Sequence, residues 1–283
     1  MYENLIIENW FGTFSTASGG TRTDVKLSRP WQTDIIVDPA TCPFCTKDEP
    51  DVSRHVDGSG LWRVLQNVFT PFPLHYLIIP GTCWTPYSLR NLGGRAKIEA
   101  LMRIVTQYVK EEHPDKELWM FINIGFLGGQ NLGHYHAHLL EPIREKNKIP
   151  LSEYDIENIN QSPLVIFENN LFKVILGGFA AGQCFFYPKT KGVLLDPRYI
   201  NQLSRAFNFV VSLYNDRFRS LQNLSPDFTI LAKFVKSEFH YATYIPALGN
   251  WWGCAQMMAI MEGTPFILAW PHEKTFQHLM VKN

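Results

Sequence analysis

The stretch "GGQNLGHYHAHLLEP", residues 128–142, carries three histidines in strict alternation behind two glycines. In an extended chain successive side chains point to opposite faces, so the sequence predicts that His134, His136 and His138 share one face. The other face receives the residues that alternate with them, which are Tyr135, Ala137 and Leu139. We therefore expect a strand whose histidine face carries the functional side chains and whose other face packs in the core.

The composition limits the kind of protein. The chain has 283 residues, of which 46% are hydrophobic and 14% aromatic, and this is enough material for a large core. The formal net charge is zero, which argues against a basic nucleic-acid-binding surface and favours a small-molecule partner. The opening "MYENLIIENWFGTF" lacks the basic end and apolar run of a secretion signal, and no apolar run is long enough to span a membrane. We expect a cytoplasmic protein with no membrane or nucleic-acid partner.

The elements around the histidines predict an α+β fold. Residues 61–80 have the pattern of a β-hairpin broken by Pro71 and Pro73, and apolar residues between 98 and 109 recur at helical spacing. A short apolar run at 118–125 then leads into the glycines and the histidine strand. The predicted order is hairpin, helix, strand, loop, strand.

The same order returns in the second half of the chain with little residue identity. After a polar stretch at 146–163, a second hairpin is predicted at 171–188. Pro197 can then open a helix, and strands follow at 228–235 and 240–246. Where the first half has three histidines, the second has "HYATY" with only one. This pattern indicates two repeats of the same architecture, the second of which lacks the alternating histidines.

Three explanations compete for the alternating histidines. Isolated histidines such as His55 and His75 are usually surface residues or satisfied core residues, but that explanation fits three alternating rings poorly. A plain metal site would use all three rings. The preceding "NIGFLGGQNLG", however, offers many backbone N–H groups beside glycines, which suits an anion cradle. Phosphate beside imidazole points to nucleophilic attack on phosphorus.

The spacing of these residues resembles a known signature, that of the histidine-triad superfamily of nucleotide hydrolases and transferases: Asn123-x-Gly125-x-x-x-Gly129-Gln130-x-x-x-His134-x-His136-x-His138. Two further features, "RPWQ" followed by "CPFC" and the segment "VLQNVF", resemble its galactose-1-phosphate uridylyltransferase-like branch. The resemblance implies two histidine-triad-like repeats, each an antiparallel sheet with a packed helix, the second degenerate. The implied boundaries are a catalytic domain with a zinc site at 1–145, a linker at 146–163 and a degenerate domain at 164–283.

By position, the resemblance makes His136 the nucleophile, which takes a nucleoside monophosphate from one substrate and passes it to a second. A neutral imidazole is nucleophilic near pH 7 when a hydrogen bond to its other nitrogen fixes the tautomer. His138 would be a second catalytic residue, at the leaving group; uridylyltransferases usually have glutamine here, and the hydrolases have histidine. The residues implied to hold the phosphate are Asn123, Gly129, Gln130 and Asn131, the last in place of a serine common in the family.

The resemblance implies further substrate contacts. Asn67 would contact the ribose, although Val68 stands where the family usually has an acid. Arg29, in "RPWQ", is expected among the substrate-binding residues. Gln256 falls where a glutamate usually reaches into the neighbouring subunit of an intertwined dimer, although structural packing explains this segment about as well. On this basis we expect a homodimer.

The "CPFC" pair, Cys42 and Cys45, indicates metal or redox chemistry more than a disulfide framework in a reducing compartment. The alternative is two buried thiols at a turn. In zinc-bearing relatives the third ligand follows the last proline of the hairpin, and the fourth is the first histidine of the triad. Those positions are Cys83 and His134 here. The resemblance thus implies a closed tetrahedral zinc site that clamps the N-terminal segment to the catalytic strand.

Three functions follow, in order of preference. The first is an enzyme, a nucleotidyltransferase that works through a covalent nucleotidyl-His136 and uses a nucleotide or nucleotide sugar and a phosphorylated small-molecule acceptor. The second is a hydrolase or phosphorylase of dinucleoside polyphosphates or nucleotide sugars, which His138 favours. The third is an inactive nucleotide-binding protein, against which the intact His136 and its glycine loop argue.

Overall fold

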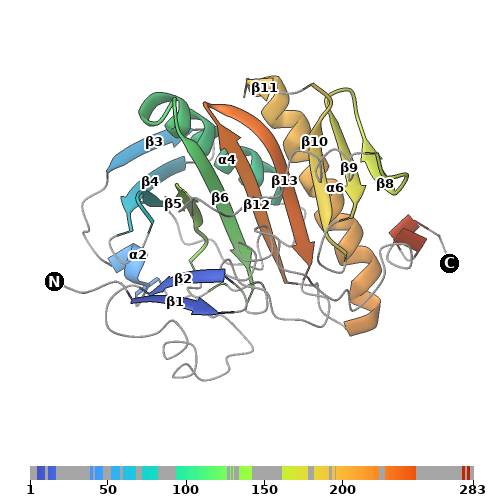
Figure 1. Ribbon diagram of the computed structural model, residues 1–283, viewed down its shortest axis with the longest axis horizontal. Helices are drawn as coiled ribbons and strands as arrows, with labels where there is room; N and C mark the ends of the chain where they lie inside the picture. The colour runs from blue at the N-terminus through green and yellow to red at the C-terminus, as the bar shows by residue number, and fades with distance from the viewer. Residues whose placement is uncertain are drawn as a thin grey trace.

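One large antiparallel sheet with two long helices forms the body of the protein in the computed structural model (Figure 1). The structure describes residues 5–9, 12–16, 39–40, 42–46, 52–57, 60–67, 72–81, 94–125, 128, 130, 134–141, 161–177, 182–190, 193–194, 196–222, 227–246, 276–277 and 279–280. This architecture confirms the predicted α+β class. Among the described helices, none is long and apolar enough to cross a membrane.

The elements follow one another in the predicted order in each half. The first half contains β1 (Leu5–Asn9), β2 (Gly12–Thr16), α2 (Pro43–Thr46), β3 (Ser53–Asp57), β4 (Gly60–Gln66), β5 (His75–Pro80), α4 (Gly94–Glu112), β6 (Glu117–Ile124) and β7 (Ala137–Leu140). The second half contains β8 (Val165–Glu168), β9 (Phe172–Leu176), β10 (Cys184–Pro188), β11 (Val193–Leu194), α6 (Pro197–Gln222), β12 (Phe228–Val235) and β13 (Glu238–Pro246). The sequence did not predict the short strands β1, β2, β3, β8 and β11.

The large sheet has the strand order β3-β4-β5-β7-β6-β12-β13-β10-β9-β8, and β11 pairs with β13. Its middle is the antiparallel pair β6–β12, which runs from Glu117 opposite Val235 to Ile124 opposite Phe228. Outward from this pair the two sides repeat the same sequence of elements. Each side has the strand after the helix, then the last strand of that half, then the two strands of the hairpin, so the halves share one continuous sheet.

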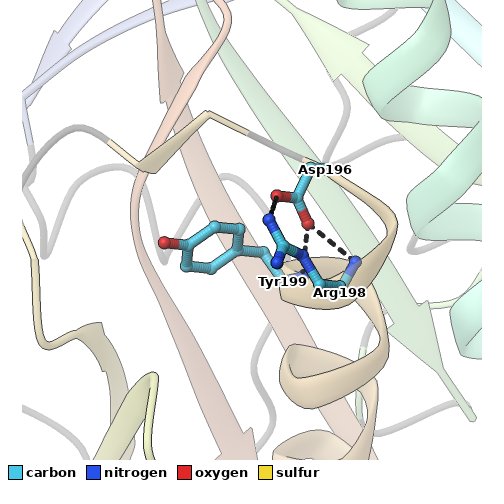
Figure 2. Close-up of polar contacts among 3 residues, drawn as sticks. All are labelled: Asp196, Arg198 and Tyr199. Atoms are coloured by element: carbon cyan, nitrogen blue, oxygen red, sulfur yellow. Dashed lines mark hydrogen bonds and ion pairs between the residues drawn. The ribbon is translucent and has the colours of Figure 1, made fainter.

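Helix α6 begins where the sequence predicts, at Pro197. The Asp196 carboxylate precedes it, and its Oδ1 accepts hydrogen bonds from the backbone N–H groups of Arg198 at 2.7 Å and Tyr199 at 3.1 Å (Figure 2). The Arg198 guanidinium also contacts Oδ2 of Asp196 at 3.3 Å. An acid before the first turn and a proline within it are favoured because the first N–H groups of a helix have no partner inside the helix. This cap sets the start of the helix that covers the second half of the sheet.

The two long helices cover one face of the sheet (Figure 1). Along β6, Met120 and Ile122 belong to the core cluster that includes the helices, and the alternate residues Trp119 and Phe121 belong to a separate cluster. Since strand side chains alternate between faces, Asn123 lies on the face away from the helices.

The histidine stretch follows the same alternation. Tyr135, Ala137 and Leu139 are fully buried in the helix-side core, as predicted. The alternate histidines are therefore on the face that carries Asn123. One detail differs from the prediction, because β7 begins only at Ala137, so His134 and His136 lie just before the strand.

Candidate active site

His136 is held by a hydrogen bond at one ring nitrogen. Its Nδ1 lies 2.8 Å from the main-chain oxygen of His134, and because a carbonyl oxygen only accepts, Nδ1 carries the hydrogen. A neutral ring then has its lone pair on Nε2. The ring also makes edge contacts with Phe44 and His138, with centroids 5.5 and 4.9 Å apart. This is the tautomer that a nucleophilic imidazole needs.

The protonation state of His136 also suits a nucleophile. The residue is only 7% exposed, and burial lowers its pKa from the usual histidine value. The hydrogen bond to the His134 carbonyl acts in the opposite direction and is outweighed, and the neighbouring His134 ring lowers the pKa further. The neutral form of His136 is therefore favoured at neutral pH.

His138 lies two residues after His136, and its ring also contacts a fourth histidine, His75. Its Nδ1 is 2.9 Å from Nε2 of His75, the first residue of β5. The amide nitrogen of Asn67 lies 3.4 Å from Nδ1 of His75. Asn67, predicted to contact ribose, is therefore close to the triad through His75.

Three predicted metal ligands come together. Cys42, Cys45 and His134 place their ligand atoms within 4.8 Å of one another. The Cys42 and Cys45 sulfurs are 3.3 and 3.4 Å from Nδ1 of His134. The turn α2 brings the two thiols to one side, because the N–H groups of Cys45 and Thr46 both donate to the Cys42 carbonyl at 3.0 Å.

The donor atoms of this cluster suit a zinc ion. Nε2 of His134 lies 3.1 Å from the Pro80 carbonyl oxygen, so it carries the hydrogen and leaves the lone pair on Nδ1, toward the thiols. A metal-binding histidine commonly donates its other ring hydrogen to a backbone carbonyl. Burial also lowers the pKa of His134, which favours the neutral ring that a metal requires. Arg63 supports the turn by donating to the Phe44 carbonyl at 2.9 Å.

The glycine loop before the triad is closed by Gln130. Its side-chain Oε1 accepts from the Gly125 N–H at 2.9 Å, and its own N–H donates to the Gly125 carbonyl at 3.0 Å. Gly125 has a φ of 78°, a conformation that glycine adopts without strain. The Gln130 amide thus serves the loop itself, and its predicted contact with a phosphate stays a prediction.

Gly128 fixes the same loop against the sheet. A Cβ at this position would lie 2.5 Å from the Phe228 carbonyl oxygen and still closer to that of Ile124, so only glycine fits. The Thr229 hydroxyl, from β12, lies 2.9 Å from the Gly128 carbonyl oxygen and 3.2 Å from Oδ1 of Asn123. A residue of the second half therefore supports the loop and the predicted phosphate contact Asn123.

The remaining predicted site residues, Arg29, Cys83, Gly129, Asn131 and Gln256, lie outside the described residues. Sequence reasoning missed three residues that contact the site, Phe44, His75 and Thr229. His75 was interpreted as an ordinary surface or core histidine, because its neighbour His138 is far away in sequence. Phe44 lies inside the "CPFC" motif, which was the one available signal for it.

No protein-family model and no curated protein matches the sequence. Solved structures do match the fold. An ADP-glucose phosphorylase from Arabidopsis thaliana with bound ADP-glucose aligns with a TM-score of 0.59 at 13% identity, over 99% of this chain and 100% of that one. A uridylyltransferase aligns with a TM-score of 0.60 at 14% identity, over 98% and 97%. A galt-like protein from Arabidopsis thaliana gives 0.58 at 15% identity, over 84% and 91%.

Proposed function

We propose that this chain, which has the fold of the galactose-1-phosphate uridylyltransferase-like branch of the histidine-triad superfamily, is a nucleotidyltransferase that works through a covalent nucleotidyl-His136. The observation that carries the proposal is the hydrogen bond between Nδ1 of His136 and the His134 carbonyl, because it leaves a lone pair on Nε2. The acceptor is a phosphorylated small molecule.

The reaction divides into two displacements at one phosphorus. In the first, Nε2 of His136 attacks the phosphorus of the nucleoside monophosphate group, the N–P bond forms, and the bond to the bridging oxygen breaks. In the second, an oxygen of the acceptor phosphate attacks the same phosphorus and the N–P bond breaks. A covalent intermediate replaces one difficult displacement with two easier ones. Burial helps, because it keeps the attacking ring neutral.

The groups that stabilise the developing charge come from the glycine loop and β6. Asn123 is 7% exposed and lies on the triad's face of the sheet, where its amide can donate to a non-bridging oxygen. Gly129 and Asn131, which follow in the chain, would add backbone and side-chain donors. Gln130 keeps the loop closed on Gly125. Preorganised donors of this kind are worth several kcal/mol when water is excluded, about 2.7–4 kcal/mol for one donor in a studied case.

We further propose that zinc is held by Cys42, Cys45, His134 and Cys83. Cys83 lies three residues after Pro80, whose carbonyl accepts from His134, and three residues of extended chain reach about 10 Å. With four protein ligands, the ion supplies structural rather than catalytic chemistry. The residues then clamp the turn α2 and the Phe44 ring against the histidine strand.

The order of the strands supports two repeats within the fold. Each half contributes a hairpin, a helix and two strands, and the halves meet at β6 and β12. We propose domain boundaries at 1–145 and 164–283 with a linker at 146–163. A homodimer in which Gln256 reaches the neighbouring site, and a substrate contact by Arg29, stay proposals from the sequence.

A phosphorylase or hydrolase is the second candidate function. The observation that favours it is His138, whose ring is beside the His136 ring. In its protonated form, an imidazole can give a proton to the bridging oxygen as the bond to phosphorus breaks, which glutamine cannot do. General acid assistance typically contributes about 10²- to 10⁴-fold. One matching fold is that of an ADP-glucose phosphorylase.

The two functions share the first displacement, so one experiment tests both. The purified protein is incubated separately with nucleoside diphosphate sugars of each base and with dinucleoside polyphosphates, and its intact mass is measured. A mass increase of one nucleotide identifies the base and supports a covalent mechanism. If no donor produces an adduct or any turnover, the proposed chemistry is absent, and a nucleotide-binding role without catalysis is the remaining candidate.

A further inference from the structure

Two histidine rings from neighbouring strands are directly hydrogen-bonded on the triad's face of the sheet. His75 opens β5 and pairs across to Leu140, while His138 in β7 pairs across to Leu77. The two rings are thus diagonal neighbours on one face, a separation that aromatic side chains can bridge. Their centroids are 5.2 Å apart, and Nε2 of His75 lies 2.9 Å from Nδ1 of His138.

Asn67 extends this contact to a third residue. Its backbone N–H donates to the His75 carbonyl at 2.8 Å, which closes the β4–β5 hairpin and holds the two residues side by side. Its side-chain amide nitrogen lies 3.4 Å from Nδ1 and 3.5 Å from Nε2 of His75. Because Nε2 already has the closer partner His138, Nδ1 is the nitrogen that accepts from the amide.

For two neutral rings, counting hydrogens along this chain gives one consistent pair of tautomers. An amide nitrogen only donates, so Nδ1 of His75 is unprotonated, and a neutral imidazole then carries its hydrogen on Nε2. That hydrogen is donated to Nδ1 of His138. Nδ1 of His138 is therefore an acceptor, and the hydrogen of the His138 ring is on Nε2. The opposite tautomer would place a lone pair at the nitrogen that points away from His75.

We propose that His75 is a positioning residue that, together with Asn67, holds His138 in the tautomer that presents an N–H at Nε2. The proposal rests on the proposed function, because its benefit is a hydrogen-bond donor beside the nucleophile. His138 contacts the His136 ring with centroids 4.9 Å apart. An Nε2–H in this place can stabilise the negative charge that develops on the departing oxygen. The ring of His75 is itself packed edge-on against Phe72, which limits its rotation.

The direct test is a measurement of tautomers that needs no substrate. The full-length, zinc-loaded protein is labelled with 15N-histidine, and long-range 1H–15N correlations are recorded near pH 8. The His138 signals are assigned by their loss in His138→Gln. We expect the Nε2-protonated pattern for His138 in the native protein. In His75→Leu, which removes the donor, the two His138 nitrogens should move toward averaged shifts.

Two further variants make this test specific. In His75→Gln the amide can donate where Nε2 did, so the native pattern of His138 should return. His55→Leu is the matched control, because His55 is in β3 and bonds Ser53 at 3.0 Å, apart from the triad. A native protein with the Nδ1-protonated form of His138, or a His75→Leu variant with unchanged His138 shifts, overturns the proposal.

The kinetic test uses two adduct-forming donors, one with a good and one with a poor leaving group. His75→Leu should slow adduct formation on the order of tenfold for the poor leaving group and little for the good one. The double variant with His138→Gln should be no slower than His138→Gln alone. Equal losses for both donors, or additive losses in the double variant, contradict a role through His138. If no donor forms an adduct, the proposed function fails, and the tautomer measurement still decides the role of His75.

Discussion

Thr229 and Asn123 are directly opposite each other in the strand pair β6–β12, and their side chains are hydrogen-bonded, with Oγ1 of Thr229 3.2 Å from Oδ1 of Asn123. The same hydroxyl is 2.9 Å from the Gly128 carbonyl oxygen. The half of the chain that lacks the alternating histidines therefore takes part in the site. It orients the side chain of Asn123, for which we predict a contact with the phosphate.

Replacing Thr229 by valine tests this support. Valine keeps the shape but removes the hydroxyl, so Asn123 and the Gly128 carbonyl lose a buried partner, at a cost of about 1–3 kcal/mol. We expect a lower free energy of unfolding in urea and slower adduct formation. Thr229→Ser retains the hydroxyl and should stay close to the native protein in both. Equal rates and stabilities for the valine and serine variants would show that the hydroxyl has no such role.

The nucleophile is tested by His136→Gly. The variant should form no nucleotide adduct, while nucleotide binding measured by calorimetry should remain, because the loop held by Gln130 and the Asn67 region are unchanged. In the native protein the adduct should be acid-labile and base-stable, as an N–P bond is. Turnover together with an adduct of this kind in the variant would place the nucleophile at another residue.

The pH dependence of adduct formation follows from the environment of His136. The ring attacks in its neutral form, so the rate falls as the pH drops through its pKa. Since burial lowers that pKa below the usual 6.5, the midpoint of the decline should lie below pH 6.5. Single-turnover rates measured from about pH 5 to about pH 9 give the pH at which the rate of adduct formation falls. A decline centred above pH 6.5 would mean that another group controls the rate.

His138→Gln separates transfer from hydrolysis. Glutamine can donate a hydrogen bond but gives up no proton near neutral pH. The variant should therefore slow reactions with poor leaving groups, and reactions with water as acceptor, more than exchange with a phosphate acceptor. We expect hydrolysis to decrease by about 10²-fold or more and exchange by clearly less. The ratio of the two rates, measured by chromatography of the products, is the readout. If both fall by the same factor, His138 only positions the phosphate.

The zinc site is tested by metal analysis. Protein made with ample zinc should hold about one ion per chain, and Cys83→Ser should reduce both this content and the thermal stability, since metal-binding free energy is also folding free energy. A loss of about 2 kcal/mol would lower the melting temperature by roughly 4–8 °C. Cys254→Ser is the control, because Cys254 is outside the predicted ligand set. Native protein that is metal-free at full stability would rule out the site.

The order of elements and the core face of the histidine stretch could be predicted because they follow from local periodicity. Tyr135, Ala137 and Leu139 alternate in the sequence and are buried together in the structure. The resemblance that the triad spacing indicates is confirmed for the fold. The matching structures are only 13% and 14% identical to this chain, so the sequence resemblance could be inferred only from short motifs.

The contacts of His75 and Thr229 could not be predicted, because both depend on the pairing of strands that are distant in the chain. His75 and His138 are 63 residues apart in the sequence, and no local sequence pattern indicates that β5 lies beside β7. The role of the Gln130 amide was also missed. The motif predicts a phosphate contact for Gln130, which stays a prediction, but it does not indicate that the Gln130 N–H donates to the Gly125 carbonyl and closes the loop.

The shared central pair β6–β12 also bears on how the protein is made in the cell. Asn123 and Thr229, opposite each other in that pair, are 106 residues apart in sequence. At roughly 5–20 residues per second, β12 leaves the ribosome about 5–20 s after β6. During that interval β6, almost entirely buried in the finished protein, has an open hydrogen-bonding edge of the kind that pairs with other chains. We expect newly made chains to need chaperone protection in this window, and truncated forms that end before β12 to aggregate.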